Sequence, residues 1–505
     1  MAFDTGNTPA TEHTGVLVIG TGFAGLGMGI KLKEAGMGDF VLLERAQSVG
    51  GTWRDNHYPG CACDVPSHLY SFSFELSPRW SRMFAVQPEI RAYLESCAQK
   101  YGLLPHVRFG AELVRAEYDE AAQLWRVRTR DGRQFTAPVL ISGMGGLSNP
   151  AYPQLPGLDR FQGPAFHSAE WRHDVDLRGK RIAVIGTGAS AIQFVPQIAP
   201  LAAQLDLYQR TPPWIMPKPD RTITRFEQKL FQYFPLVQRL WRGLIYWMLE
   251  ARALGFVVHP RLMKGVQWVA NRHIRKQVQD PALRAKLTPD YTIGCKRILI
   301  SNDYYPALTR PNVAVLTQGI SEVRAHGVVT ADGVEHPADV LIYGTGFKAQ
   351  EPVPRGMLFG RGGVDLHEAW AQGVEAYLGT TVSGFPNFFM IVGPNTGLGH
   401  SSMVYMIESQ VHYILQALKL QRERGLGALE VKPEVQAQFN QGLQARLGRT
   451  IWTAGCKSWY LDRNGKNTTL WPGFTFHFRK ATREFRLDDY RLSTQAAPAS
   501  TVTAP

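Results

Sequence analysis

The residues that decide the fold are Val16–Gly25, which read VLVIGTGFAG. Four apolar residues typical of a buried strand lead directly into a G-x-G-x-x-G loop, and apolar residues then recur at helical spacing from Ala24 to Ala35. A second apolar run, Phe40–Leu43, ends at Glu44. Strand, glycine loop, helix and strand form a complete βαβ unit, so the sequence predicts a nucleotide-binding fold near the N-terminus.

The same pattern occurs again in the middle of the chain. A strand-like run at 181–185 enters the loop Gly186–Ala191, GTGASA, and a further strand-like run at 205–208 ends before Arg210 and Thr211. Strand, loop and charge context therefore coincide twice. This repetition indicates two nucleotide folds rather than two accidental glycine turns.

Two more apolar runs, 139–143 and 339–347, end in small residues and suit crossovers between these units. The sequence thus predicts an α/β protein with two Rossmann-like dinucleotide-binding domains and a helical insertion. The predicted parts are a discontinuous first domain at 1–150 and 348–492, a second domain at 151–212 and 292–347, a helical insertion at 213–291, and a disordered tail at 493–505.

The insertion carries a stripe of large apolar side chains, namely Phe231, Phe234, Leu240, Leu244 and Trp247. Core packing explains such a stripe, and a membrane-surface or substrate-entry role is the alternative. Charges interrupt the apolar stretch 236–260, so no transmembrane span is expected. Met1–Thr14 lacks the basic and apolar regions of a signal peptide and is predicted to be a disordered lead-in.

Composition narrows the class of partner and the compartment. The 505 residues include 55 Lys and Arg against 42 Asp and Glu, a net charge of +13, but the basic residues form no long run. We therefore expect no nucleic-acid partner. The cysteines are few, odd in number and thinly spread, which argues against a disulfide framework and for a reducing, cytoplasmic location; they are Cys61, Cys63, Cys97, Cys295 and Cys456.

The charged residue at each strand end indicates which nucleotide each unit binds. In the first loop, Gly20 permits a tight turn, Gly22 lets the backbone approach a pyrophosphate, and Gly25 brings helix against strand. Glu44 is placed to bind a ribose diol and would repel a 2′-phosphate, which fits FAD or NAD. Arg210 stands at the equivalent place in the second unit and suits a 2′-phosphate, so the second nucleotide is predicted to be NADPH.

Two such sites predict a flavoprotein that takes hydride from NADPH and passes electrons to an acceptor. A disulfide reductase needs a redox cysteine pair, but only one residue separates Cys61 from Cys63, and closing that ring would be strained. Oxygen is the other common acceptor. It requires a fixed cation beside the flavin in a site that excludes water.

Motifs outside the glycine loops resemble those of a known family. The spacing Phe161-x-Gly163-x-x-x-His167-x-x-x-Trp171 resembles the fingerprint of Baeyer–Villiger monooxygenases, which are class B flavoprotein monooxygenases. The family usually has Pro or Asp after the tryptophan, where this chain has Arg172.

Two further motifs follow the family order. Gly50–Trp53, Tyr58–Gly60 and Asp64 are similar to one of them, and Lys296-Arg297 with the tyrosines at 304–305 is similar to the other. Pro306 stands where the family often has an acidic residue. Together with the segments at 344–347 and 393–401, the similarity spans most of residues 16–490.

The resemblance implies a reaction and assigns residues to it. The expected reaction is NADPH- and O₂-dependent conversion of a ketone to an ester or lactone through a C4a-peroxyflavin, with sulfide oxidation as a further activity and no metal. Arg297 is then the catalytic cation and Asp64 its carboxylate partner, both also contacting cofactor. The other matched cofactor positions are Thr52, Trp53 and Tyr70 for the flavin, Gly186, Gly188, Ser190, Ala191, Arg210, Thr211 and Lys296 for NADPH, and Trp459 in a loop over the nicotinamide.

Other interpretations stay open at this point. His167 is linked in the family to coupling between the NADPH domain and the flavin, but a packed linker histidine fits equally well. Surface pairing would account for Arg297, a loop cap for Asp64, and exposed aromatic packing for Trp459. The alternative functions are an N- or S-oxidising flavin monooxygenase, which does not need Arg297 and Asp64, and a non-catalytic sensor that binds FAD and NADPH. The sequence identifies neither the ketone nor the oligomeric state.

Overall fold

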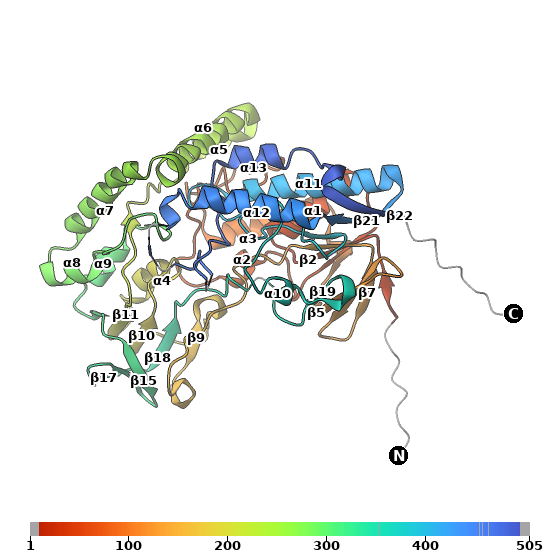
Figure 1. The fold of residues 1–505 in the computed structure, drawn as a ribbon. Coiled ribbons are helices and arrows are strands. Elements are labelled where there is room, and N and C mark those ends of the chain that lie inside the picture. Colours follow the sequence, from red (N-terminus) through yellow and green to blue (C-terminus); the bar gives the residue numbers. More distant parts are fainter. Residues whose placement is uncertain (1–9, 352, 454, 457, 463, 495–505) are drawn as a thin grey trace, which may run out of the picture.

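The computed structural model describes residues 10–351, 353–453, 455–456, 458–462 and 464–494. Its first α/β unit is built on a parallel sheet in the order β20-β8-β2-β3-β4 (Figure 1). The strands are all apolar or nearly so, as expected where helices or loops cover both faces. They are β20 Phe388–Met390, β8 Val139–Ser142, β2 Val16–Ile19, β3 Phe40–Leu43 and β4 Val107–Arg108.

Helix α1, Phe23–Glu34, connects β2 to β3 as predicted, and α11, Met403–Arg424, packs against it. Because β20 pairs with β8, the sheet joins the N-terminal part of the chain to a segment beyond residue 348. This is the arrangement predicted for a discontinuous first domain, although the domain boundaries themselves stay a prediction.

A mixed sheet lies beside this unit in the order β1-β7-β6-β5-β19. Its strands are β1 Glu12–His13, β7 Gln134–Ala137, β6 Leu124–Thr129, β5 Leu113–Asp119 and β19 Leu358–Phe359. Since Glu12 and His13 pair with β7, the prediction of a disordered lead-in is wrong at these two residues. Residues 1–9 of the lead-in lie outside the described part of the chain.

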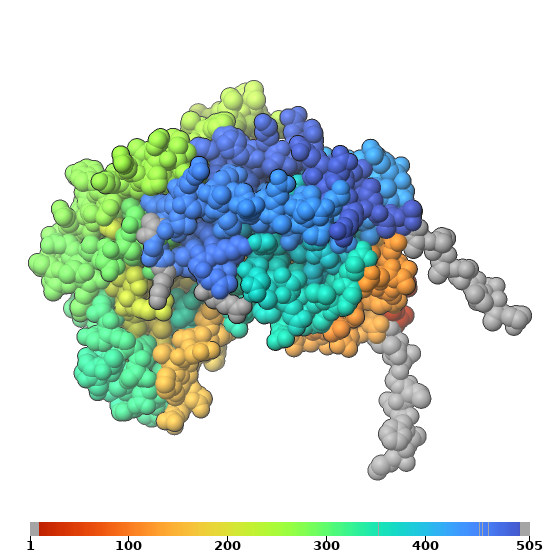
Figure 2. Space-filling model, in the orientation of Figure 1, coloured from red at the N-terminus to blue at the C-terminus, as the bar shows by residue number. Residues whose placement is uncertain are grey.

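The second α/β unit has a parallel sheet in the order β14-β11-β10-β18-β9. Its strands are β14 Val313–Leu316, β11 Gln204–Tyr208, β10 Arg181–Ile185, β18 Val340–Tyr343 and β9 Ala165–His167. Helix α4, Ala191–Ile198, follows β10, and a three-stranded antiparallel sheet of β15 Ile320–Arg324, β16 Gly327–Thr330 and β17 Glu335–Pro337 extends the unit. The space-filling view shows this unit as a lobe separated by a hollow from the first (Figure 2). The predicted two-domain α/β fold is confirmed.

The insertion is mostly helical, as predicted. Near its start, β12 Ile215–Met216 pairs in parallel with β13 Leu299–Ile300, which follows the insertion. The helices are α5 Arg225–Tyr233, α6 Pro235–Ala253, the π-helical η4 Leu254–Val258, the 3₁₀ turn η5 Pro260–Leu262, α7 Met263–Gln277 and α8 Pro281–Leu287. No helix of the described residues is long and apolar enough to cross a membrane.

The C-terminal part closes over the first unit. Strands β21 Leu426–Val431 and β22 Tyr490–Thr494 pair antiparallel, so the predicted disordered tail is wrong at Ser493 and Thr494, and residues 495–505 lie outside the described part. The remaining elements are α2 Thr52–Asp55, α3 Gln87–Lys100, α9 Tyr304–Leu308, α10 Leu366–Ala369, α12 Pro433–Leu447, α13 Thr475–Ala481 and the 3₁₀ turns η1 Leu104–His106, η2 Leu158–Arg160, η3 Ser168–Glu170, η6 Arg361–Gly363, η7 Ile451–Thr453 and η8 Leu487–Asp489.

Candidate active site

The first glycine loop has the geometry that a bound pyrophosphate needs. Gly20 has φ +94°, and a Cβ there would lie 2.8 Å from the carbonyl oxygen of Gly143. A Cβ on Gly25 would lie 1.8 Å from the Gly20 oxygen, so only glycine lets α1 approach β2 this closely. Gly22 begins α1 and has more space, its nearest neighbour being the Cα of Gly51 at 3.6 Å. The three glycines thus leave the helix N-terminus open to an anion.

The second loop repeats this arrangement with one substitution. Gly186 has φ +110°, and a Cβ there would approach the Gly344 oxygen to 2.4 Å. Gly188 is open, whereas Ala191, fully buried, takes the place of the third glycine at the start of α4, directly after Ser190. Because α4 meets β18 at a glycine, Gly344, its first residue can carry a methyl group.

Glu44 lies at the end of β3 but is already engaged by protein groups. Its carboxylate accepts from Thr21 N at 3.1 Å and Thr21 Oγ1 at 2.6 Å, and from Ala46 N at 2.9 Å. Arg54 Nη1 pairs with it at 2.8 Å, and the Glu44 side chain is 4 % exposed. Glu44 therefore fixes the glycine loop, and its predicted contact with a ribose stays a prediction.

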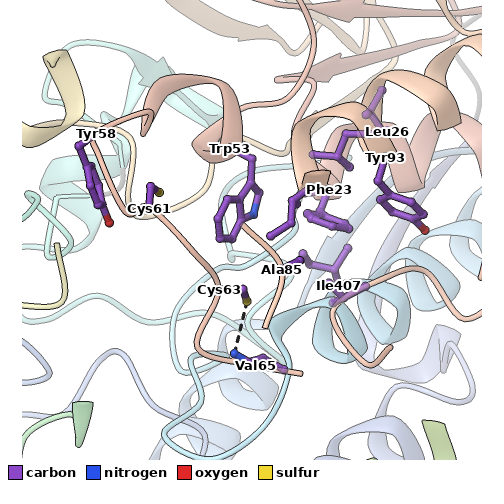
Figure 3. Packing of buried hydrophobic residues seen from close by; sticks show 14 of the residues in the cluster. Phe23, Leu26, Trp53, Tyr58, Cys61, Cys63, Val65, Ala85, Tyr93 and Ile407 are labelled. Carbon is purple, nitrogen blue, oxygen red and sulfur yellow. Dashed lines mark hydrogen bonds between the residues drawn. The ribbon is translucent and has the colours of Figure 1, made fainter. Parts of the chain in front are cut away.

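The predicted flavin-side residues lie together beside the loop. Trp53 on α2 donates from Nε1 to Tyr70 Oη at 3.2 Å, and the two rings meet edge to face at 5.5 Å. Figure 3 shows Trp53 between Phe23 of α1 and the segment that carries Cys61 and Cys63. Thr52 precedes Trp53 and is exposed.

Cys61 and Cys63 are free thiols, which agrees with the exclusion of a redox pair. Val65 N donates to Cys63 Sγ at 3.4 Å (Figure 3), and burial raises the pKa of the Cys61 thiol to about 12. A thiol with so high a pKa is a poor nucleophile near neutral pH.

The segment that precedes Asp64 is docked on the second unit. Tyr58 Oη donates to Gln193 Oε1 at 2.9 Å, Gln193 Nε2 donates to the Ala62 oxygen at 2.9 Å, and a Cβ on Gly60 would meet the Gln193 oxygen at 2.7 Å. Since Gln193 is on α4, these contacts hold the segment in the interface between the two folds. Asp64 comes two residues after Ala62 in this docked segment.

Asp64 meets Arg297 in this interface. Arg297 Nη2 and Nε lie 2.5 Å and 3.1 Å from the same oxygen, Oδ2, and Arg297 Nη1 donates to the Leu398 oxygen at 3.4 Å. The side chains are 32 % and 34 % exposed, so the pair is half-buried rather than on an open surface. The half-buried pair fits the arrangement that the family resemblance implied better than it fits a surface ion pair for Arg297 or a loop cap for Asp64.

Both charges in this pair are stabilised. The charge of Asp64 raises the pKa of Arg297, against the opposing effect of burial. Burial acts to raise the pKa of Asp64, but the charge and hydrogen bonds of Arg297 outweigh it, and the pKa is held below its usual value. Arg297 therefore stays a cation at the interface at any physiological pH.

A second cationic cluster lies by the other glycine loop. Thr187 Oγ1 donates to the Thr211 oxygen at 3.1 Å, which places Arg210 beside the loop. Burial, and then the charge of Arg210, lower the pKa of Lys296, and the charge of Asp290 opposes both effects. Within the described residues neither forms an ion pair. Two cations that act on each other and form no ion pair favour binding of a dianion such as a 2′-phosphate.

The fingerprint residues are largely explained by packing. A Cβ on Gly163 would lie 2.2 Å from the Asp339 oxygen, and Trp171 packs against Phe194 of α4. His167, fully buried on β9, accepts from Ala169 N at 3.1 Å through Nδ1. Burial lowers the pKa of His167. Phe161 is partly buried in the same lobe, and the exposed Arg172 pairs with Asp174.

A disulfide connects the arginine loop to the C-terminal segment that carries Trp459. Cys295 and Cys456 are bonded, with Cα atoms 6.2 Å apart. From the number of cysteines we expected no disulfide framework. The structure has one disulfide among the described residues, and it lies at this site. Trp459 is 43 % exposed, whereas Tyr460 is buried, and its Oη has no hydrogen-bond partner among the described residues.

The comparisons with known proteins agree with this geometry. A family model described as flavin-binding monooxygenase-like matches residues 13–355. A Baeyer–Villiger monooxygenase of Pseudomonas aeruginosa is 58% identical over 497 residues, 98% of this chain and 94% of the relative. The chain is a member of this monooxygenase family. A Baeyer–Villiger monooxygenase of Streptomyces coelicolor is 51% identical, covering 97% of this chain and 94% of its own length.

Solved monooxygenase structures share the whole fold. An oxidised steroid monooxygenase bound to NADP matches with a TM-score of 0.85 and 30% identity, over 95% of this chain and 99% of that one. Cyclohexanone monooxygenase from Rhodococcus sp. Phi1 bound to NADP⁺ matches with a TM-score of 0.85 and 29% identity, over 96% and 100%. Both of these neighbours are bound to NADP, and both glycine loops of this chain have the backbone geometry that a bound dinucleotide needs.

Sequence reasoning missed several groups near the pair. The charges of Lys218 and Arg252, both from the insertion, act on Asp64. Arg252 is one of four charged residues on α6, and in the sequence these charges indicated only that the helix does not span a membrane. Glu250, two residues earlier on α6 and fully buried, accepts from Thr475 Oγ1 at 2.6 Å and lies 3.5 Å from His400 Nε2.

Proposed function

We propose that this monooxygenase uses NADPH and O₂ to convert ketones to esters or lactones, with sulfide oxidation as a side reaction. The observation that carries the proposal is the Arg297–Asp64 pair in the interface between the two nucleotide folds. An N- or S-oxidising flavin enzyme has no need of a cation held in this way. A sensor without catalysis has no need of it either.

The residues that would hold the cofactors divide between the two units. In the first, Gly20, Gly22 and Gly25 would hold the pyrophosphate of FAD, with Trp53 and Tyr70 near the flavin. In the second, the loop at 186–191 would hold that of NADPH. A bound flavin, reduced by NADPH, would supply the redox chemistry that activates O₂ for transfer of one oxygen atom to the substrate.

The protein's own contribution is electrostatic. Oxygen insertion beside a carbonyl develops negative charge on the attacking oxygen and then on the carbonyl oxygen. A guanidinium that cannot lose its proton stabilises both, and it costs no reorganisation if it is already oriented. Asp64 supplies that orientation through two hydrogen bonds to Arg297. Arg297 is the proposed catalytic residue, and Asp64 positions it.

Selection of NADPH is proposed to rest on the second cationic cluster. The charge of Arg210 acts on Lys296, neither forms an ion pair in the described chain, and Lys296 is the direct neighbour of Arg297. A residue proposed to bind the 2′-phosphate, Lys296, is thus next in sequence to the proposed catalytic cation, Arg297. For location, we propose the cytoplasm because three of the five cysteines are free thiols; the Cys295–Cys456 bond is the opposing observation, since disulfides are rare there, and cell fractionation decides.

Product analysis tests the proposal. The FAD-loaded protein is incubated with NADPH, O₂ and a panel of linear, cyclic and aryl ketones together with a sulfide, and products are identified by mass spectrometry. Esters or lactones support it. Sulfoxide without any ester favours the N- or S-oxidising alternative, and the absence of substrate-dependent NADPH consumption favours the sensor.

A further inference from the structure

The outer face of α6 is apolar and exposed. Leu236, Leu240, Leu244 and Trp247 follow one another at intervals of one helical turn and are 67 %, 67 %, 51 % and 60 % exposed. The opposite face, with Ile245, packs inward and is buried. The helix therefore has an exposed apolar face in addition to the face that the fold buries. Of the stripe interpreted as core packing, only Phe231 is buried, so that interpretation is wrong for the other four residues.

This surface continues over the neighbouring helices. Figure 1 shows α5, α6 and α7 along one edge of the molecule, and Figure 2 shows the same elements forming its rim. We call the exposed apolar residues here the apolar ridge. Its members are Phe226, Tyr233, Phe234, Leu236, Val237, Leu240, Leu244, Trp247, Met248, Leu254, Val258, Leu262 and Trp268, each at least 37 % exposed. Exposed apolar surface this extensive marks an interaction site.

Cations are interleaved with the apolar ridge, and free carboxylates are not. Residues 225–277 contain ten Lys and Arg against two Asp and Glu, in a chain whose net charge is +13. Glu227 is paired with Arg221, and Glu250 is buried. In the described chain, the exposed cations here have no ion-pair partner; they are Arg225, Lys229, Arg239, Arg252, Arg261, Lys264, Arg272, Arg275 and Lys276.

The cations share faces with the apolar side chains instead of lying opposite them. Lys229 lies between Phe226 and Tyr233 at helical spacing on α5. On α7, Lys264 and Arg272 lie one turn before and after Trp268, and the Arg272 guanidinium lies 5.7 Å from the Trp268 ring. Apolar side chains with interspersed Lys and Arg suit the boundary between acyl chains and anionic headgroups.

The same pattern disfavours a second copy of the chain as the occupant. In a two-fold dimer each patch meets itself, so cations of one copy would face cations of the other. The ridge offers no free carboxylate to neutralise them. An anionic lipid surface instead provides both negative charge and apolar depth.

We propose that the apolar ridge docks the enzyme reversibly on the surface of a membrane that contains anionic lipids. The helices lie on the interface and do not span it. Helix α6 then links the membrane to the active site, since its last turn carries Arg252, whose charge interacts with Asp64. Apolar ketones concentrate in such membranes, so docking places the enzyme beside a reservoir of them.

Vesicle sedimentation tests the proposal with the FAD-loaded enzyme. The probes are vesicles of phosphatidylcholine alone and vesicles that also contain phosphatidylglycerol, each at low and high salt. We expect binding to the anionic vesicles at low salt, weakened about tenfold or more either by removing the anionic lipid or by adding salt. No binding to anionic vesicles, or equal binding to both kinds, would overturn the proposal.

Two variants separate the apolar and cationic contributions. Leu240→Glu with Leu244→Glu, and Lys229→Glu with Arg239→Glu, change only exposed side chains and should each reduce vesicle binding about tenfold or more while FAD content and melting temperature stay unchanged. The matched controls lie on the second unit: Val334→Glu for the first, and Arg160→Glu with Lys180→Glu for the second. Controls that reduce binding equally would contradict the assignment to the ridge. So would a dimer in light scattering that the leucine variant converts to monomer, because a second copy would then occupy this face.

Discussion

Replacing Arg297 by alanine should separate the chemistry from folding and cofactor binding. Arg297 makes two hydrogen bonds to one oxygen of Asp64 and a long one to Leu398, and it is 32 % exposed. A pair this exposed contributes at most about 1 kcal/mol to stability. The variant should therefore fold and retain FAD, because the glycines at 20, 22 and 25 are unaffected.

The effect on the reaction should be far larger than the effect on folding. Removing one preoriented charge donor costs about 10²–10³ in rate. NADPH oxidation that persists should then yield hydrogen peroxide rather than ester. The assay is the ratio of ester to hydrogen peroxide per NADPH consumed, under identical oxygen, in the unmodified enzyme and the variant.

Arg172→Ala is the matched control for this prediction. Arg172 also pairs with an aspartate, Asp174, but on the surface of the second unit. Its loss should leave the ratio of ester to peroxide unchanged. A folded, FAD-loaded Arg297→Ala enzyme that makes ester at near-normal yield would refute the reasoning, as would an equal loss in the Arg172 control.

Three further predictions concern the rest of the site. Arg210→Ala and Lys296→Ala should each lower kcat/KM for NADPH about tenfold or more, mainly through KM, and leave NADH use nearly unchanged; equal losses with both nucleotides would contradict the role in 2′-phosphate binding. Asp64 has a pKa below its unfolded value of about 3.9, so the stability it adds is present above that pH and lost as pH falls through the lower folded pKa. The melting temperature of the unmodified enzyme should accordingly exceed that of Asp64→Asn at neutral pH and converge with it in acid; a gap that persists in acid would argue against the ionised pair. Cys456→Ser removes a cross-link between residues 161 apart. A reductant should therefore lower the melting temperature of the unmodified enzyme, by an amount equivalent to about 2–5 kcal/mol, and leave that of the variant unchanged. Equal sensitivity to reductant in both proteins would show that the cross-link contributes nothing.

The sequence was most informative where structure depends on local patterns. Both βαβ units were predicted because strand, glycine loop and helix follow one another directly, and Gly20 and Gly186 adopt the positive φ values that this turn requires. Asp64 and Arg297, by contrast, are 233 residues apart. Only the family motifs, not spacing or periodicity, predicted that they belong together.

The errors share a cause in long-range contacts. Glu12–His13 and Ser493–Thr494 look disordered because their composition is polar, but their backbone groups are satisfied by β7 and β21, far away in the chain. The partner of Cys295 was equally invisible, since cysteine spacing does not determine connectivity. On α6, periodicity identified an apolar stripe but gave no sign of which face the fold would cover.

The most direct test of oxygen insertion into a ketone is isotope labelling of the product. The FAD-loaded enzyme is supplied with NADPH, isotope-labelled dioxygen and a ketone that the product panel has identified as a substrate. The account predicts one labelled atom per ester, located in the ring or chain oxygen and not in the carbonyl, with one NADPH consumed for each ester formed. Unlabelled ester, or a labelled sulfoxide as the sole oxygenated product of the panel, would contradict it.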